Sequence, residues 1–160
     1  MQTATLAHLK NELKTMPSAD LIEVCIKLIK FKKENKELVS YLLFESGNET
    51  AYILNLKNEI DELFNQVNTN SVFWAKKTIR KILRIITKHS KYSGIATTQI
   101  EMLLHFCNKL NELPLDYTNN AAMFNLYNNQ LKKMDKLMLT LHEDLQFDYL
   151  QRIDQLRIQA

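Results

Sequence analysis

The stretch YILNLKNEIDELFNQVNTNSVFWAKKTIRKILRIITKHSKY, residues 52–92, carries two helical repeats of apolar residues on either side of a polar turn. In the first half, apolar residues three and four positions apart are Ile53, Leu56, Ile60, Leu63, Phe64 and Val67. In the second half they are Val72, Ala75, Ile79, Ile82, Leu83 and Ile86. This spacing places the apolar side chains on one face of each helix. The polar segment NTNS, residues 68–71, supplies the turn, so the stretch predicts an antiparallel helical hairpin.

The composition extends this prediction to the whole chain. The 160 residues include only two Gly and two Pro, whereas sheet proteins need turn residues at frequent intervals. These four residues, Pro17, Gly47, Gly94 and Pro114, all lie between periodic segments. The sequence therefore predicts an all-α protein of six to eight antiparallel helices, arranged as a helical-hairpin stack or bundle.

The apolar spacing and the turn residues also predict the helix boundaries. We expect helices over residues 3–16, 18–31, 49–67, 71–92, 98–113 and from 118 onward, with a bend or restart within 33–45. Ser18 is a candidate N-cap for the second helix. Thr98 with Glu101, and Thr140 with Glu143, have the spacing of capping boxes, which predicts helix starts at both places and a break in the last segment.

Length and hydropathy place the chain in the globular class. With 160 residues and 46% hydrophobic composition it suits one domain, residues 1–160, with a core that needs neither disulfides nor metals. It has no apolar run long enough to span a membrane and no signal-peptide pattern, so we expect no membrane association and a cytoplasmic location. Cys25 and Cys107 lie in apolar periodic segments and are interpreted as core residues.

The N-terminal segment LKNELKTMPSADLIEVCIKLIKFKKENKELVSYLLFE, residues 9–45, has a Leu-rich first helix, a turn at LKTMPSADLI and the run KENKELVSYLLF. It resembles the opening of a family of small uncharacterised bacterial all-helical proteins, and this resemblance implies no activity, cofactor or site. The successive hairpins also look like a short armadillo or HEAT-like stack. That likeness implies binding to other macromolecules.

Several catalytic and cofactor chemistries lack their motifs in this chain. A sequence with two Gly has no phosphate-binding loop, and no His follows a Glu at the spacing of di-iron bundles. The segment HEDLQ at His142 ends in Gln146, where a zinc protease motif needs a second His. His105 and Cys107 point about 200° apart on a helix, which disfavours a dyad. We therefore predict no cofactor, metal or catalytic residue from sequence.

The basic helix, residues 71–92, is the most suggestive feature. Between Trp74 and Tyr92 it has seven basic residues and no acidic one. On a helical wheel, Lys77, Lys81, Arg84 and Lys88 lie opposite the apolar face, while Lys76, Arg80 and Lys91 follow one flank. Trp74, Ile85 and Tyr92 form a second apolar ridge beside them. The candidate partner or nucleic-acid surface comprises Trp74, Lys77, Lys81, Arg84, Lys88 and Lys91.

This helix permits more than one interpretation. It is a phosphate-binding surface with adjacent aromatic rings, a docking site for a partner, or a solvated outer face whose Trp ridge packs on a third helix. The rest of the chain has 14 basic and 18 acidic residues, a net charge of −4. The preceding acidic helix predicts internal pairs from Glu62 to Lys76 or Lys77 and from Glu59 to Arg80 or Lys81.

These observations favour a non-catalytic macromolecular-interaction or assembly module, with a protein partner or self-association. Nucleic-acid binding through the basic helix 71–92 is the alternative. An enzyme with a site assembled only in space is the second alternative.

Overall fold

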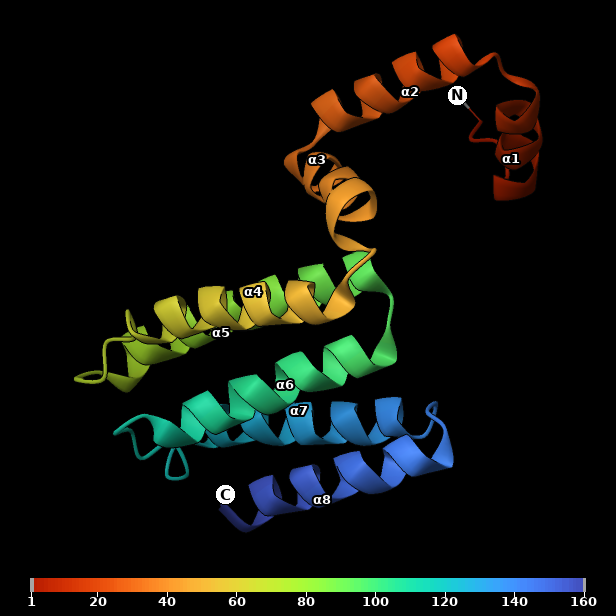
Figure 1. The fold of residues 1–160 in the computed structure, drawn as a ribbon. Coiled ribbons are helices and arrows are strands. Elements are labelled where there is room, and N and C mark those ends of the chain that lie inside the picture. Colours follow the sequence, from red (N-terminus) through yellow and green to blue (C-terminus); the bar gives the residue numbers. More distant parts are fainter. Residues whose placement is uncertain (1, 160) are drawn as a thin grey trace. The chain divides into compact units, whose positions relative to one another are not determined.

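The computed structural model describes residues 2–159, which form eight α-helices and no strand (Figure 1). The helices are α1 (Leu6–Thr15), α2 (Ser18–Phe31), α3 (Lys33–Ser40), α4 (Glu49–Phe64), α5 (Val72–Ser93), α6 (Ala96–Glu112), α7 (Ala121–Met138) and α8 (Glu143–Gln159). One π-helical segment, Tyr41–Glu45, continues α3. The all-α prediction and the expected number of helices are confirmed. None of the helices in the described range is long and apolar enough to cross a membrane.

The chain divides by its contacts into two units, one ending at Phe44 and the other beginning at Glu45. In the first unit, α2 packs against α3, and the Asn35 side-chain amide donates a hydrogen bond of 2.8 Å to the carbonyl of Leu28. That carbonyl is one of the last four of α2, which have no partner within the helix. The prediction of a single domain stays a prediction.

The first unit differs from the sequence prediction in its burial. No residue of α1, α2 or α3 is buried. The apolar residues that recur at helical spacing in α1 and α2 include the exposed Leu6, Leu9, Leu13, Ile22 and Leu28. Cys25, interpreted as a core residue, is exposed as well. The prediction was wrong here because helical periodicity identifies a face that needs cover but not the surface that covers it.

The second unit is a stack of hairpins around α6 (Figure 1). Helix α6 contacts α4, α5, α7 and α8, and it holds eight buried residues on several of its faces. The core contains Leu56, Ile60, Phe64, Ala75, Ile79, Ile82, Ile86, Ile100, Leu103, Leu104, Phe106, Cys107, Leu110, Met123, Tyr127, Met134, Ile153 and Leu156. Within this unit the predicted helical-hairpin stack is confirmed.

Several predicted helix starts were wrong in detail. Helix α6 begins at Ala96, and the Thr98 hydroxyl donates to Glu49 at 2.6 Å instead of capping the helix. Helix α2 includes Ser18 as its first residue, so Ser18 is not its N-cap. The break before α8 is confirmed, but Glu143 is the first residue of that helix, and the Thr140 hydroxyl donates back to the carbonyl of Leu137. In each case the hydroxyl group has a different partner or position from the one that a capping box requires.

A chain of hydrogen bonds holds α8 against α6 and α7. The fully buried hydroxyl of Tyr127 accepts a hydrogen bond from the Asn111 amide at 3.1 Å and donates to the carbonyl of Leu156 at 3.0 Å. Tyr117 donates to the other end of the Asn111 side chain. Because Leu156 lies in the last turn of α8, this carbonyl has no partner within the helix. Tyr127 thus satisfies a buried acceptor that water does not reach, and burial raises the pKa of its hydroxyl.

We expect Tyr127→Phe to lower the free energy of unfolding by about 1–3 kcal/mol, because it leaves the Leu156 carbonyl without a donor. Urea unfolding gives the magnitude, and amide hydrogen exchange in residues 153–158 should quicken. Asn111→Ala and the double variant complete a cycle in which the losses are expected to be less than additive. An unchanged unfolding midpoint for Tyr127→Phe would contradict this assignment.

Candidate interaction surface

Helix α5 is built as the apolar spacing predicts. Ala75, Ile79, Ile82 and Ile86 are fully buried, while Val72 and Leu83 pack against the core from its edge. The helix ends at Gly94, whose φ of 68° lies in the left-handed region and whose amide donates to the Ser90 carbonyl at 2.9 Å. Glycine adopts this conformation without strain, so it stops the helix cleanly. The buried stripe fixes which side of α5 faces outward.

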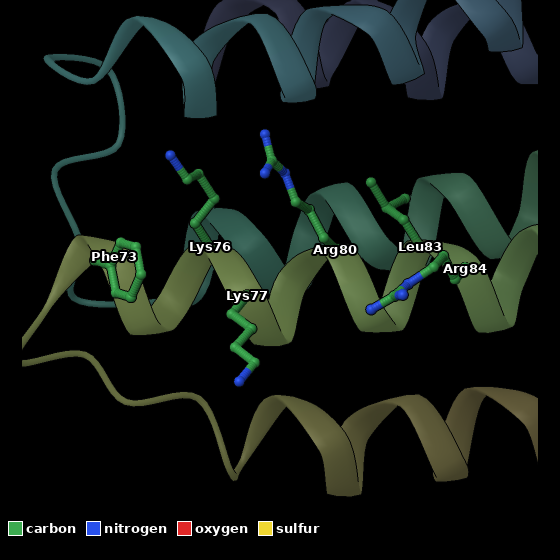
Figure 2. A pocket seen from close by; sticks show the side chains of 6 residues that line it. All are labelled: Phe73, Lys76, Lys77, Arg80, Leu83 and Arg84. Carbon is green, nitrogen blue, oxygen red and sulfur yellow. The ribbon is translucent and has the colours of Figure 1, made fainter.

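The outward side carries an open hollow with a volume of about 560 Å³ (Figure 2). It is lined by Phe73, Lys76, Lys77, Arg80, Leu83 and Arg84, and we call it the α5 groove. Two predicted site residues, Lys77 and Arg84, line it, whereas Lys81, Lys88 and Lys91 lie outside this lining. In Figure 2, Lys76 and Arg80 extend to one side of the helix and Lys77 to the other. The cationic surface is therefore shifted from the predicted row toward the Lys76 flank.

Two exposed aromatic rings lie at the N-terminal end of the α5 groove. Phe73 and Trp74 are 66% and 51% exposed, and their ring centroids are 5.2 Å apart in an edge-to-face arrangement. The Lys77 ammonium lies 5.5 Å from the centroid of the Trp74 ring. The predicted ridge is therefore divided, because Ile85 packs against the core whereas Trp74 remains half exposed. The solvated-face interpretation required a third helix to cover Trp74, and within residues 2–159 no helix buries it.

Sequence reasoning missed Phe73, although its spacing contains the signal. Phe73, Lys77, Arg80 and Arg84 are separated by four, three and four residues, which places them along one line of the helix surface. Phe73 belongs neither to the buried stripe of α5 nor to the ridge of Trp74, Ile85 and Tyr92 that the sequence predicted. The Phe73 ring is exposed in the structure and lies beside Lys77, Arg80 and Arg84, so it belongs to the same candidate surface as these cations.

The predicted ion pairs between α4 and α5 were wrong. Glu59 and Glu62 are exposed, and neither forms an ion pair with a described residue of α5. Asp61 of α4 has basic partners, His105 and Lys109, and both lie on α6. The hairpin brings the apolar faces of α4 and α5 together, so the acidic face of α4 does not lie against the basic face of α5.

The four cations of the α5 groove keep their positive charge available. Within residues 2–159, no carboxylate lies within ion-pair distance of Lys76, Lys77, Arg80 or Arg84. The first turn of α5 also has no acidic residue, so its unpaired amide groups add to the positive potential there. The arrangement attracts anionic groups toward the end of the helix that carries Phe73 and Trp74.

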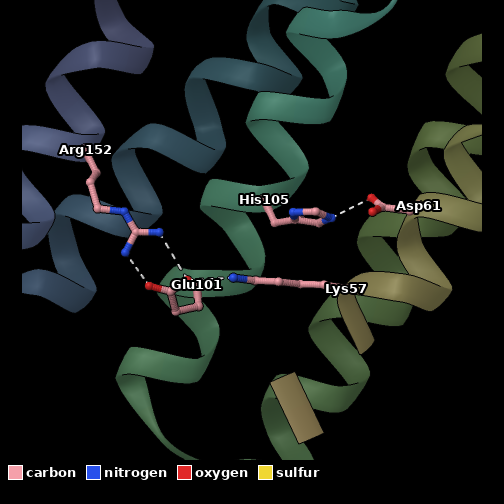
Figure 3. A network of polar contacts seen from close by, with 5 residues as sticks. All are labelled: Lys57, Asp61, Glu101, His105 and Arg152. Carbon is pink, nitrogen blue, oxygen red and sulfur yellow. Dashed lines mark hydrogen bonds and ion pairs between the residues drawn. The ribbon is translucent and has the colours of Figure 1, made fainter. Parts of the chain in front are cut away.

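A second polar cluster joins α4, α6 and α8 (Figure 3). Glu101 of α6 accepts a hydrogen bond from Lys57 of α4 at 2.8 Å and two from the guanidinium of Arg152 of α8, one of them 3.1 Å long. One turn along α6, His105 contacts Asp61 of α4 at 2.6 Å. Glu101 and His105 are four residues apart, so they share one face of α6, and their partners come from α4 and α8.

Glu101 is held in its charged form by this cluster. Burial alone would raise the pKa of its carboxyl group, but the hydrogen bonds and positive charges of Arg152 and Lys57 outweigh it and lower the pKa to about 2. A carboxylate with such a low pKa is a poor proton donor or acceptor near neutral pH. The cluster therefore has the properties of a structural ion-pair network that fastens three helices together.

The remaining reactive side chains offer little chemistry. Burial raises the pKa of the Cys107 thiol well above its ordinary value, which keeps it protonated and unreactive. In the part of the chain that the structure describes, no three His, Cys, Asp or Glu side chains gather as metal ligands would. No protein-family model, curated protein or solved structure matches this chain. The assignment of function consequently depends on the surfaces of the molecule alone.

Proposed function

We propose that this protein is a non-catalytic assembly module that acts in the cytoplasm and associates with a second copy of itself through α1 and α2. The observation that carries the proposal is the absence of any buried residue in α2, although nine of its fourteen residues are apolar. The resemblance of residues 9–45 to small bacterial all-helical proteins stays a prediction and adds no activity to this proposal.

Helix α2 has apolar side chains on opposite sides. Ile22 and Phe31 are nine residues apart, which separates them by about 180° around the helix axis. They are 60% and 75% exposed, and Ile26 and Leu28 between them are also exposed. The polar residues Asp20, Glu23, Lys27 and Lys30 share the arc on one side between them, so the apolar surface takes up the rest of the circumference and is wider than one neighbouring helix covers. The apolar surface of α2 thus supports an association with more than one further helix.

The spacing in α1 supports a second copy as the occupant. Leu6, Leu9, Leu13 and Met16 follow intervals of three, four and three, which is the pattern of a coiled-coil seam. The three leucines are exposed, and such a seam packs well against an identical one. Two-fold association of identical surfaces is also the commonest form of oligomer. Two copies that pair their α1 and α2 helices provide several apolar faces for each α2.

Light scattering coupled to size-exclusion chromatography tests this association on the full chain. We expect the wild-type protein to elute with twice the mass of one chain, and the variant Ile22→Glu with Phe31→Glu to elute as a monomer. The helices α4 to α8 have their own core, so the variant should keep most of its helical circular dichroism.

The matched control is Phe147→Glu, which places a charge at an exposed apolar residue of α8. This control should remain dimeric. A wild-type protein that is monomeric at every concentration, or a double variant that still dimerises, would overturn the proposal. If the wild type is monomeric and binds a different protein through α1 and α2, this result would also count against self-association.

A further inference from the structure

We propose that the α5 groove binds single-stranded nucleic acid, with its cations on the phosphates and its exposed aromatic rings against the bases. This inference is independent of the proposed self-association, because it concerns a different helix. It rests on three observations that coincide along α5: cations without ion-pair partners, two exposed rings beside them, and an open hollow that the cations and the Phe73 ring line.

The cations are placed to follow a phosphate backbone. Lys76, Lys77, Arg80 and Arg84 recur over about 12 Å of helix axis at 1.5 Å per residue, with Lys76 and Arg80 extending to one side of the groove and Lys77 to the other. Since none is neutralised by a carboxylate, each is free to displace a counterion from a phosphate, which is the main source of affinity for nucleic acids. The rest of the chain has a net negative charge, so the positive charge of the protein is concentrated on α5.

The aromatic rings indicate why the nucleic acid would be single-stranded. Phe73 lines the groove at 66% exposure, and Trp74 packs edge-to-face against it. Bases stack on such rings only when their faces are free, as in a single strand, and this stacking tolerates any sequence. A duplex keeps its bases stacked on one another and would use only the cations. An acidic protein would likewise leave the ring faces without a matching flat partner.

Fluorescence provides a direct measurement, because Trp74 is the only Trp in the chain. The probes are an unlabelled oligothymidylate strand, a duplex of the same length and polyglutamate. We expect the single strand to quench Trp74 emission in low salt and to bind more tightly than the duplex. With four phosphate contacts, the logarithm of affinity should fall against the logarithm of salt concentration with a slope of about −3.

Two variants separate the charge contribution from the stacking contribution, and for these a fluorescein-labelled strand reports binding by anisotropy. Arg80→Gln with Arg84→Gln should reduce the magnitude of the salt slope by about 1.4, because two phosphate contacts are lost. Phe73→Ala should weaken single-strand binding about fivefold or more while leaving the salt slope unchanged. The matched charge control is Lys132→Gln with Lys136→Gln on α7, two exposed lysines outside the α5 groove, and it should retain the wild-type slope and affinity.

Four outcomes would overturn the proposal. They are no binding of the single strand at low salt, equal affinity for strand and duplex, an equal loss in the α7 control, and an unchanged affinity in Phe73→Ala. Preferential binding of polyglutamate would assign the groove to an acidic protein instead. The substituted residues are exposed, so we expect each variant to unfold at the same temperature as the wild type. This measurement verifies that a change in binding does not come from a loss of the fold.

Discussion

Phe106→Ala is expected to lower the free energy of unfolding by about 3–5 kcal/mol, the largest single-residue effect that we predict. Phe106 lies on α6, is fully buried, and packs against Phe64 of α4 with 5.6 Å between the ring centroids. Removing its ring leaves a cavity where α6 meets its neighbours, and the surrounding helices can close it only in part. Because small domains are stable by roughly 5–15 kcal/mol, this loss is a large share of the total.

Urea unfolding followed by circular dichroism measures this effect, and Phe147→Ala is the matched control. Phe147 is 63% exposed on α8, so its truncation should change the free energy of unfolding by less than about 0.5 kcal/mol. The comparison removes the same ring from a buried and from an exposed position. Equal losses in the two variants would mean that α6 is not the packing centre of the second unit.

The helices were predictable from the sequence where their cause is local. The hairpin of α4 and α5, its buried stripes and the break before α8 all follow from apolar spacing and turn residues within a few positions. An apolar face on a helix has a strong preference for burial, so its direction was also predictable. The structure confirms these features because no distant contact has to override them.

The sequence did not predict the features that depend on which helices meet. Thr98 lacks its capping role because the fold brings Glu49 of α4 within hydrogen-bond distance, and Glu59 is exposed without an ion-pair partner on α5 in the range 2–159. Similarly, α2 and α4 both have apolar residues at helical spacing. Of these two helices, α4 has buried residues and α2 has none. Spacing describes each helix alone, whereas these outcomes depend on pairs of helices far apart in sequence.

The candidate surface also has some features that were predictable from local spacing and others that depend on how the helices pack. The outward direction of Lys77 and Arg84 was predictable from the wheel, and both line the α5 groove. The absence of ion pairs to α4 was not predictable, because it depends on how the two helices are rotated against each other. The spacing of Phe73 places it in line with Lys77, Arg80 and Arg84, but spacing does not show whether another helix covers the ring, and the structure shows that it is exposed.

Glu101→Gln is expected to destabilise the protein at neutral pH by about 2 kcal/mol. The lowering of the Glu101 pKa from 4.5 to about 2 corresponds to roughly 3 kcal/mol of preference for the charged form, at 1.36 kcal/mol per pH unit. Arg152 is 45% exposed, so solvent screening reduces the expected loss below that figure. The amide of Gln keeps the shape of the side chain, but it removes the charge and replaces one acceptor oxygen with an NH2 group that cannot accept a hydrogen bond from Arg152 or Lys57.

The pH dependence identifies the cause of this loss. Because the folded pKa is lower than the unfolded one, the charged carboxylate stabilises the fold above pH 4.5, and this contribution is lost as the pH falls from about 4.5 to about 2. The stability difference between wild type and Glu101→Gln should therefore be constant near neutral pH, shrink within that window and vanish near pH 2. Glu59→Gln, at an exposed carboxylate of α4, should differ from wild type by less than about 0.5 kcal/mol at neutral pH. Urea unfolding across this pH range makes the comparison. A loss in Glu101→Gln that persists unchanged at low pH would come from altered packing, and Glu101 would then not be the charge that holds α4, α6 and α8 together.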